Sequence, residues 1–350
     1  MVKAPAAGDT RAGLVQAGVS SGAAPLDSPS PAIATPTATA SGMATADPLS
    51  NGAHARALIE GHGRRLSQLQ REVLRDGDRE PLHQVRVSLR RLRTVLSLFG
   101  PALVLPRGVR AARIASLARC TGATRDLDVL GERLQGQLLP RLDPADHQAL
   151  RPLLRRLARR RQRAFHTAQE ALSSPRTERL LRKIDRWQRR PQFTALGQEP
   201  LADWQSEWHR PLSAALFLHP GWWAAQPRDP ALHALRKRIK GVRYSLEALG
   251  EPLEASRHDW IAALKQAQGV LGELHDLQVL EALLHEESAA VPRSARRGLQ
   301  AELERQRAIE WARWRELSGR LLRPECRAAL SSLSPLPPWP AAPGPEAAGS

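Results

Sequence analysis

Basic residues recur at helical spacing in the segment LHQVRVSLRRLRTVLSLFG, which begins at Leu82. No Asp or Glu lies between Leu82 and Gly100. The candidate ligand-binding residues of this segment are His83, Arg86, Arg90 and Arg93. Arginine suits phosphate because its planar guanidinium group makes two parallel charge-assisted hydrogen bonds and stays protonated. Several arginines on one face need a ligand with several phosphates, so the segment predicts a polyanion-binding surface.

A helix is the element that would place these side chains together. At about 100° per residue, the four basic residues fall within an arc of about 80°. The apolar residues of the same segment lie on a neighbouring face and form a predicted core stripe. The basic stripe therefore borders the buried face, and we expect its side chains to line the lip of a groove, with packed stems and free charged heads.

The pattern returns 150 residues later in LHALRKRIKGVRYSLEALG, which begins at Leu232. The candidate binding residues of this second copy are His233, Arg236, Lys240 and Arg243. At the same offset, TGATRDLDVL from Thr121 matches LGELHDLQVL from Leu271. Two further basic pairs, Arg155 with Arg305 and Arg163 with Arg313, obey the offset and join the candidate set. A constant offset without insertion indicates an internal duplication.

The histidines and aspartates of the repeat admit more than one role. His83 and His233 could contact phosphate, bind a metal or make structural hydrogen bonds. Neither has another His, Cys, Asp or Glu three or four residues further along its predicted helix, which disfavours a metal. Asp126 and Asp276 are predicted near helix N-termini, where they could orient arginines.

Charge and composition limit the class of protein. The chain has 350 residues, with 52 Lys and Arg against 35 Asp and Glu, a net charge of +17. Both ends are slightly acidic, so the excess lies in the middle and favours an anionic partner or reflects general arginine enrichment. The two cysteines, Cys120 and Cys326, have neither zinc-ligand nor disulfide-framework spacing. We expect no signal peptide, no membrane span and a cytoplasmic location.

The order of segments predicts an all-α protein with unstructured ends. Residues 1–50 and 334–350 are rich in Ala, Ser, Pro and Gly and are predicted to be disordered. Helices are expected to begin near Ala53, Pro81, Gly108, Thr124, Pro144, Pro175, Asp229, Glu254, Leu274, Val291 and Pro324. The segment 191–228 is expected to be an irregular connector with one helix. Its tryptophans are predicted packing anchors: Trp204, Trp208, Trp222 and Trp223.

The paired motifs LHQVRVSLRRLR with ATRDLDVL, and LHALRKRIKGVRY with ELHDLQVL, resemble the conserved histidine α-helical domain, or CHAD. The resemblance covers residues 51–333, with repeat halves at about 53–190 and 204–333. It implies two pseudo-symmetric four-helix bundles and a basic groove that binds inorganic polyphosphate. The two copies differ at two matched positions. The second copy has Gly241 where the first has Arg91, and Gln278 where the first has Asp128. The second difference leaves the role of Asp128 open.

Three functions remain in competition on the sequence alone. The favoured one is non-catalytic binding of polyphosphate, without a cofactor or a metal, and with attachment to polyphosphate granules as an extension. Non-sequence-specific nucleic-acid binding is less favoured because Tyr244 is the only aromatic residue among the basic positions that could stack on a base. A metal-dependent phosphohydrolase is also less favoured, since the nearest carboxylate pair, Asp126 and Asp128, points about 200° apart on a helix. Oligomeric state is left undetermined.

Overall fold

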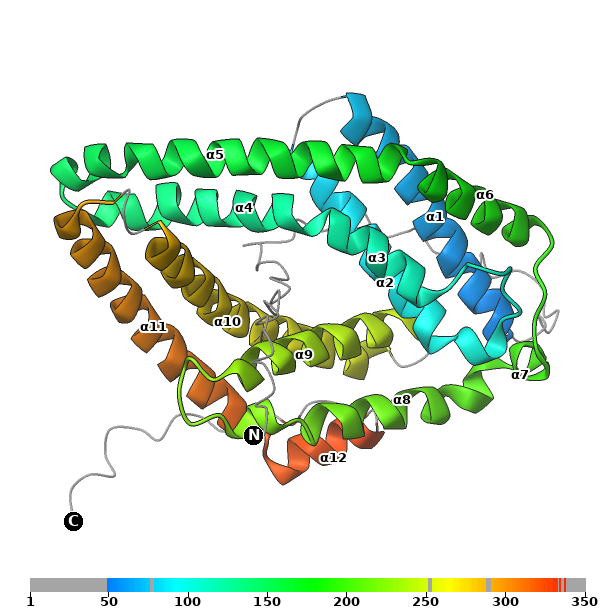
Figure 1. Ribbon diagram of the computed structural model, residues 1–350. Coiled ribbons are helices and arrows are strands. Elements are labelled where there is room, and N and C mark those ends of the chain that lie inside the picture. Colours follow the sequence, from blue (N-terminus) through cyan, green and yellow to red (C-terminus); the bar gives the residue numbers. More distant parts are fainter. Residues whose placement is uncertain are drawn as a thin grey trace, which may run out of the picture.

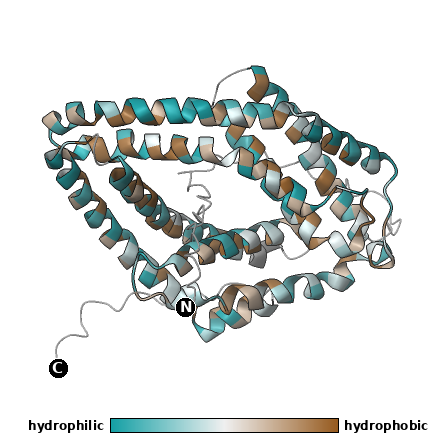
Figure 2. Cartoon of the chain, viewed as in Figure 1, coloured by the Kyte–Doolittle hydropathy of each residue, from teal (hydrophilic) through white to brown (hydrophobic). Residues whose placement is uncertain are grey.

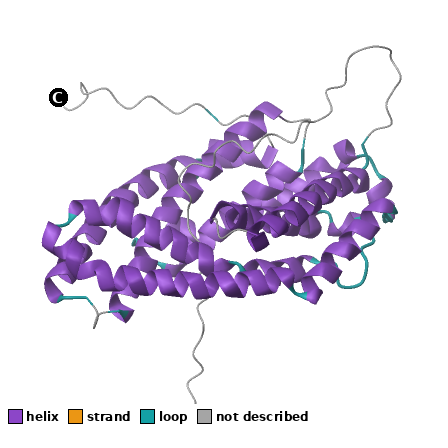
Figure 3. Cartoon of the chain, turned by 90° about the horizontal axis from the view of Figure 1, so that it is seen from above, coloured by secondary structure: helices purple, strands orange, loops and turns teal. Residues whose placement is uncertain are grey.

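The computed structural model describes residues 49–75, 79–250, 254–287 and 291–332, together with Ser334 and Pro337. Apart from Leu49, Ser50, Ser334 and Pro337, the two predicted disordered tails lie outside the described residues. Within these residues all regular elements are helical, which confirms the all-α prediction (Figure 3). Two isolated β-bridges, between Ser50 and Pro200 and between Leu103 and Phe193, tie connectors together.

Twelve α-helices make up the described fold (Figure 1). The first part of the chain forms α1 (Asn51–Arg75), α2 (Arg79–Leu98), α3 (Ala111–Cys120), α4 (Gly122–Arg133), α5 (Pro144–Ser173) and α6 (Pro175–Arg189). The second part forms α7 (Ala195–Gln198), α8 (Leu201–Phe217), α9 (Pro230–Ala248), α10 (Glu254–Glu286), α11 (Arg293–Leu321) and α12 (Pro324–Ser332). Short elements join them: η1 (Gly100–Ala102), the π-helical η2 (Leu134–Leu138), η3 (Leu139–Arg141) and η4 (Pro220–Trp223).

The helix boundaries follow the offset of the sequence repeat. Counterparts about 150 residues apart are α1 and α8, α2 and α9, α5 and α11, and α6 and α12. The pair α3 and α4 corresponds to the single helix α10. Duplication therefore extends beyond the segments whose sequences match, to the helices on either side of them.

The prediction of separate helices beginning near Glu254 and Leu274 was wrong, because α10 runs without a break from Glu254 to Glu286. In the first copy, α3 ends at Cys120, and the hydroxyl of Thr121 donates a hydrogen bond to the carbonyl of Ala118 at 3.0 Å. Such back-bonding competes with regular helix geometry. The second copy has Leu271 at that position, and its side chain is buried in an apolar core, which favours a continuous helix.

The connector before α9 is mostly helical, with α8 as its main element. Trp208 donates a hydrogen bond from Nε1 to Asn51 Oδ1 at 2.8 Å, and Trp222 stacks on Trp314 with ring centroids 5.5 Å apart. These two residues act as packing anchors as predicted, and Trp204 is half-buried. Trp223 is 64% exposed, so the prediction was wrong for this residue.

Three apolar cores hold the helices together. The first joins α1, α2, α3 and α6 with the end of α5, and the second joins α8, α9 and α12 with the start of α10 and the end of α11. The third core packs α4 and the start of α5 against the end of α10 and the start of α11, so it combines both halves of the repeat. In Figure 1, α9 and α10 lie in the middle of the view, with α4 and α5 above and α8 below.

Hydropathy varies around each helix in the way this packing requires. Along α4 and α5, hydrophobic and hydrophilic residues alternate every few positions, as amphipathic helices do (Figure 2). Within the described part of the chain, no helix is both long enough and apolar enough to cross a bilayer. Both cysteines are free thiols, Cys120 exposed and Cys326 buried.

Two tryptophans provide a test of this packing. Trp314 is 1% exposed in the second core, and replacing it by Ala leaves a large cavity. We expect Trp314→Ala to lower the free energy of unfolding by about 3–5 kcal/mol. The matched control Trp223→Ala changes an exposed side chain and should stay within about 0.5 kcal/mol. Urea denaturation followed by circular dichroism measures both, and equal effects would contradict the assignment of Trp314 to the core.

Candidate polyanion-binding site

Helices α2 and α9 pack side by side and bring the two basic segments together. Tyr244 of α9 marks the contact, because Arg90 of α2 donates a hydrogen bond from Nη1 to the Tyr244 hydroxyl at 2.9 Å. The guanidinium carbon of Arg90 lies 5.4 Å from the centre of the Tyr244 ring, and that of Arg243 lies 4.4 Å from it. Two arginines from different repeat copies thus share one aromatic ring.

The basic residues that this packing gathers are here called the cation cluster: Arg86, Arg90, Arg236, Lys240 and Arg243. Arg236 has no exposed surface, and Lys240 is only 9% exposed. The expectation of charged heads on a groove lip was therefore wrong for all members except Arg90, which is half-buried. A helical wheel gives the direction of a side chain but not the depth of the neighbouring helices that cover it.

Arg86 reaches across α3 and α4 because Gly122 has no side chain. Its Nη1 donates a hydrogen bond to the carbonyl of Ala118 at 3.2 Å. A Cβ atom on Gly122 would lie 3.2 Å from the same nitrogen, closer than ordinary van der Waals contact. Burial lowers the pKa of Arg86 to about 10, and the nearby carboxylate of Asp126 opposes this shift.

Arg236 and Lys240 lie deeper. Burial lowers the pKa of Arg236, with Asp276 opposing the shift and the charge of Arg90 adding to it. Burial also lowers the pKa of Lys240 well below its ordinary value, and the charges of Arg90, Arg236 and Arg86 push it further down. The cluster therefore holds its positive charges against both desolvation and mutual repulsion.

Asp126 and Asp276 supply negative charge beside the cluster. Asp126 lies in the second turn of α4 and is 9% exposed, while Asp276 is 4% exposed. Their charges raise the pKa values of neighbouring cations: Arg86 and Arg236 near Asp126, and Arg236 and Lys240 near Asp276. The predicted helix N-terminal position was wrong for Asp276, which lies in the middle of the continuous helix α10.

Arg93 and the two histidines border the cluster. Arg93 on α2 is exposed but partly screened from water by its neighbours, and this partial desolvation, together with the charges of Arg90 and Arg119, lowers its pKa. His83 is half-buried on α2. His233 on α9 faces His275 of α10, with ring centroids 4.0 Å apart.

The four remaining candidates lie on other helices. Arg155 and Arg163 are exposed on α5, and among the described residues neither side chain makes a hydrogen bond or ion pair with the cluster. On α11, Arg305 pairs with Glu302 at 2.7 Å and Arg313 pairs with Glu310 at 2.7 Å. The structure thus brings together the candidates of α2 and α9 and leaves these four outside.

Arg305 and Arg313 line a separate pocket of about 380 Å³. Its other lining residues are Arg133, Gln137, Arg141, Glu273, Gln306, Ile309 and Glu310. Arg133 is buried and pairs with Glu273 at 2.8 Å. Because glutamates partner the arginines of this pocket, it carries less uncompensated charge than the cation cluster.

The two copies fasten their helices by different ion pairs. Asp128 of α4 accepts a hydrogen bond from Arg161 Nε of α5 at 3.0 Å. The sequence left the role of Asp128 open, and this contact gives it a structural partner. In the second copy, Gln278 at the equivalent position donates to the carbonyl of Pro227 at 3.2 Å.

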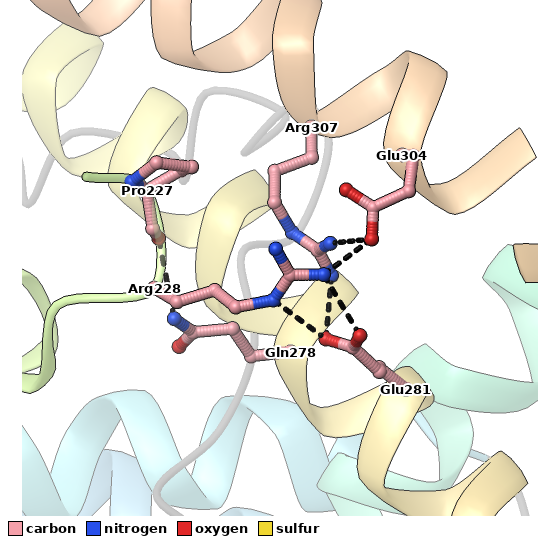
Figure 4. Close-up of polar contacts among 6 residues, drawn as sticks. All are labelled: Pro227, Arg228, Gln278, Glu281, Glu304 and Arg307. Atoms are coloured by element: carbon pink, nitrogen blue, oxygen red, sulfur yellow. Dashed lines mark hydrogen bonds and ion pairs between the residues drawn. The ribbon is translucent and has the colours of Figure 1, made fainter. Parts of the chain in front are cut away.

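A four-residue network replaces the Asp128 pair in the second copy (Figure 4). Arg307 of α11 is 1% exposed and pairs with Glu304 at 2.6 Å and with Glu281 of α10 at 2.8 Å. Arg228, which directly precedes the N-cap of α9, pairs with the same two glutamates. The network therefore fixes the start of α9, the helix that carries half of the cluster.

Sequence reasoning missed several residues that the structure places at the site. Tyr244 links the copies, Glu247 pairs with Arg243 at 3.0 Å and with Arg91 at 3.6 Å, and His275 stacks on His233. The repeat could have pointed to His275, because it directly precedes Asp276 just as the basic residue Arg125 directly precedes Asp126 in the first copy. Within the described part of the chain, no three His, Cys, Asp or Glu side chains gather in a way that could hold a metal ion.

A duplicated all-helical fold with a buried cation cluster between its repeated helices defines the class of protein to which this chain belongs. The chain matches the family model of the CHAD domain over residues 57–285. It therefore belongs to the CHAD domain family, as the motifs predicted.

Known proteins of similar sequence include two relatives from one organism. Two uncharacterised proteins of Mycobacterium tuberculosis, from strains CDC 1551 / Oshkosh and ATCC 25618 / H37Rv, are each 30% identical over 176 residues. The match covers 49% of this chain and 34% of each relative, so the chain spans about a third of their length.

Two solved structures share the fold. The crystal structure of the CHAD domain from the plant Ricinus communis aligns with a TM-score of 0.54 and 25% identity, over 82% of this chain and 92% of that chain. PptA from Streptomyces chartreusis aligns with a TM-score of 0.58 and 19% identity, over 77% of this chain and 99% of that chain. The second likeness concerns the fold alone.

Lys240 provides a test of the electrostatic cost of the cluster. Its pKa is lowered in the folded state, so the unfolded chain binds more protons at neutral and mildly alkaline pH. Folding stability should therefore rise as pH increases from the folded pKa of Lys240 toward the ordinary lysine pKa of 10.5. Lys240→Met keeps the volume and removes the charge, so we expect the free protein to gain about 1 kcal/mol or more at pH 7.

Urea denaturation between pH 7 and pH 9.5 measures this effect. The variant should show a flatter rise of stability with pH than the parent. Lys265→Met, which changes an exposed lysine of α10, is the matched control and should keep the parent's slope. A Lys240→Met protein that is less stable than the parent at pH 7 would contradict the electrostatic account.

Proposed function

We propose that this chain is a non-catalytic binding protein for inorganic polyphosphate. The observation that carries the proposal is the cation cluster, in which α2 and α9 bring five basic side chains together beside the carboxylates Asp126 and Asp276. Even with Glu247 included, basic groups outnumber acidic ones at this place. An anionic ligand supplies the missing charge, and clustered guanidinium groups match phosphate oxygens in geometry.

The lowered pKa values support a ligand that neutralises the cluster. Burial and repulsion disfavour the charged forms of Arg86, Arg236 and Lys240 in the free protein. A phosphate chain beside them offsets both effects, so part of the free energy of binding comes from relief of repulsion already present.

A linear polymer suits the distribution of charge better than a single phosphate. Arg93 on α2 and Lys237 on α9 are exposed cations at the edge of the cluster, and each is electrostatically coupled to it or to its bordering histidine. A ligand with several phosphates can contact the exposed cations and act electrostatically on the buried ones at the same time. Each additional contact releases counterions, so binding should be strongly salt-dependent.

Nucleic acid is the second candidate ligand. Sequence-tolerant binding of single strands uses aromatic rings on which bases stack. Tyr244 is 6% exposed, and its ring and hydroxyl already contact Arg90 and Arg243. This observation favours a ligand that consists of phosphates alone.

Binding without turnover is the third part of the proposal. Asp128 is held by Arg161, and Asp126 and Asp276 adjoin cations of the cluster. These carboxylates therefore have electrostatic partners that fit an orienting role. In a cytoplasmic setting, multivalent binding of this kind would carry the chain to polyphosphate granules.

A competition titration tests the choice of ligand. Labelled long-chain polyphosphate is bound to the full chain at near-physiological salt and then challenged with unlabelled polyphosphate, tripolyphosphate, double-stranded DNA or single-stranded DNA. We expect long-chain polyphosphate to compete at least tenfold better per phosphate than either DNA. Equal competition by DNA would reduce the site to a general polyanion surface, and release of phosphate with Mg²⁺ or Mn²⁺ would overturn the non-catalytic proposal.

Substitutions at accessible positions test the site. Arg90→Gln with Arg93→Glu removes one cation of the cluster and reverses a bordering one, at positions that are half-buried and exposed. We expect the double variant to bind polyphosphate at least tenfold more weakly, with a shallower salt dependence. Arg182→Glu, on the exposed face of α6, is the matched control and should bind within about twofold of the parent. Unchanged affinity in a folded double variant would exclude this site.

A further inference from the structure

Two imidazole rings stack beside the cation cluster in the second repeat copy. His233 of α9 and His275 of α10 have ring centroids 4.0 Å apart and planes inclined by 37°. Both side chains are half-buried, so each retains some access to solvent. The pair therefore lies between the buried cluster and the surface.

The charges that act most strongly on the pair are cations. On α9 these are Arg236, Lys237 and Lys240, which lower the pKa values of both rings. The carboxylate of Asp276, next to His275 on α10, acts on Arg236 and Lys240.

The neighbouring helices add charges of both signs. From α2, Arg86 and Arg90 act on Lys240. From α4, Asp126 acts on Arg236. Burial, assisted by the cations, places the pKa of His233 at about 4 and that of His275 at about 3, so both rings are neutral at pH 7.

One nitrogen of each ring is buried without a hydrogen-bond partner among the described residues. These atoms are Nδ1 of His233 and Nε2 of His275. A neutral imidazole has one donor and one acceptor nitrogen, while its protonated form has two donors. A phosphate oxygen accepts hydrogen bonds only from donors, so protonation increases the number of contacts that this pair can make.

The first repeat copy has no such pair. The position equivalent to His275 is Arg125, which carries a permanent charge. The two copies thus place different groups beside their matched aspartates: a fixed cation in one copy and a titratable group in the other. The stacked pair is therefore a feature of the second copy, whereas the first copy has His83 at the position of His233 and an arginine at the position of His275.

We propose that His233 and His275 form a proton-coupled phosphate contact, which takes up a proton from solvent when a phosphate chain binds and so tightens binding as pH falls. The proposal rests on the proposed polyphosphate-binding function and deepens it. The bound phosphates add negative charge beside the cations that surround the two rings, and this favours the imidazolium form. The imidazolium then donates an N–H to a phosphate oxygen, and no bond other than N–H is made or broken.

Isothermal titration calorimetry of the full chain with long-chain polyphosphate tests this coupling. Titrations at pH 5.5, 6.5 and 7.5 and constant ionic strength, each in two buffers of different ionisation enthalpy, give the affinity and the number of protons taken up. One coupled proton makes the affinity rise by up to about tenfold per pH unit. We expect net proton uptake and a rising affinity from pH 7.5 to pH 5.5.

Variants separate this pair from other titrating groups. His233→Gln with His275→Gln keeps hydrogen-bonding capacity but cannot titrate, so it should lose the extra affinity that the parent gains between pH 7.5 and pH 5.5. The terminal groups of polyphosphate also titrate, and the double variant measures that background. His258→Gln changes an exposed histidine of α10, the helix that carries His275, and should retain the parent's dependence of affinity on pH.

The outcomes distinguish the two proposals. Polyphosphate binding with the same proton uptake in parent and double variant would reject the histidine coupling and leave the binding function intact. An absence of polyphosphate binding by the folded parent would reject both. Loss of proton uptake in the double variant alone, with uptake retained in the His258→Gln control, would support the coupling.

Discussion

Mutual repulsion among cations withdrawn from water is the constraint on which the centre of this molecule depends. Arg86, Arg236 and Lys240 would each be more stable when charged in solvent, and their proximity raises the cost further. Apolar cores on several sides hold α2 and α9 together against that repulsion. Local acids and one aromatic ring compensate part of this repulsion, so positive charge remains in excess at the cluster.

The duplication preserved the basic residues of the cluster, whereas the ion pairs that hold the neighbouring helices diverged. Both copies keep the basic spacing on α2 and α9, yet the helices behind them are fastened by different groups. Asp128 with Arg161 links α4 to α5 in the first copy, whereas Glu281 with Arg307 links α10 to α11 in the second. A helix-to-helix ion pair needs only opposite charges at a suitable crossing, so many sequences supply one. The cluster needs basic residues at particular positions around α2 and α9, which explains why the sequences of the two copies are most similar in these helices.

Much of the fold and part of the site could be predicted from the sequence. The 3.6-residue period predicted the helices, and the offset predicted that Arg90 and Lys240 occupy equivalent positions. Burial of Arg236 could not be predicted, because one helix's periodicity carries no information on the helices that cover it. The approach of His275 to His233 is likewise a tertiary contact. By contrast, Glu302 and Glu310 lie three residues before Arg305 and Arg313, so local pairing of those arginines was visible in the sequence.

In the proposed function, the location of charge decides where a polyanion binds this chain more than the total charge does. Exposed arginines on α11 have glutamate partners one turn away, and solvent screens what charge remains. Cations between α2 and α9 are poorly solvated, and the field of charges in such surroundings is screened much less. In the proposed function, a phosphate polymer that first meets scattered surface arginines gains most when it reaches the cation cluster, where basic groups outnumber acidic ones and are largely withdrawn from water. Beside the cluster, the stacked histidines of the second copy are neighbouring groups that can still acquire charge.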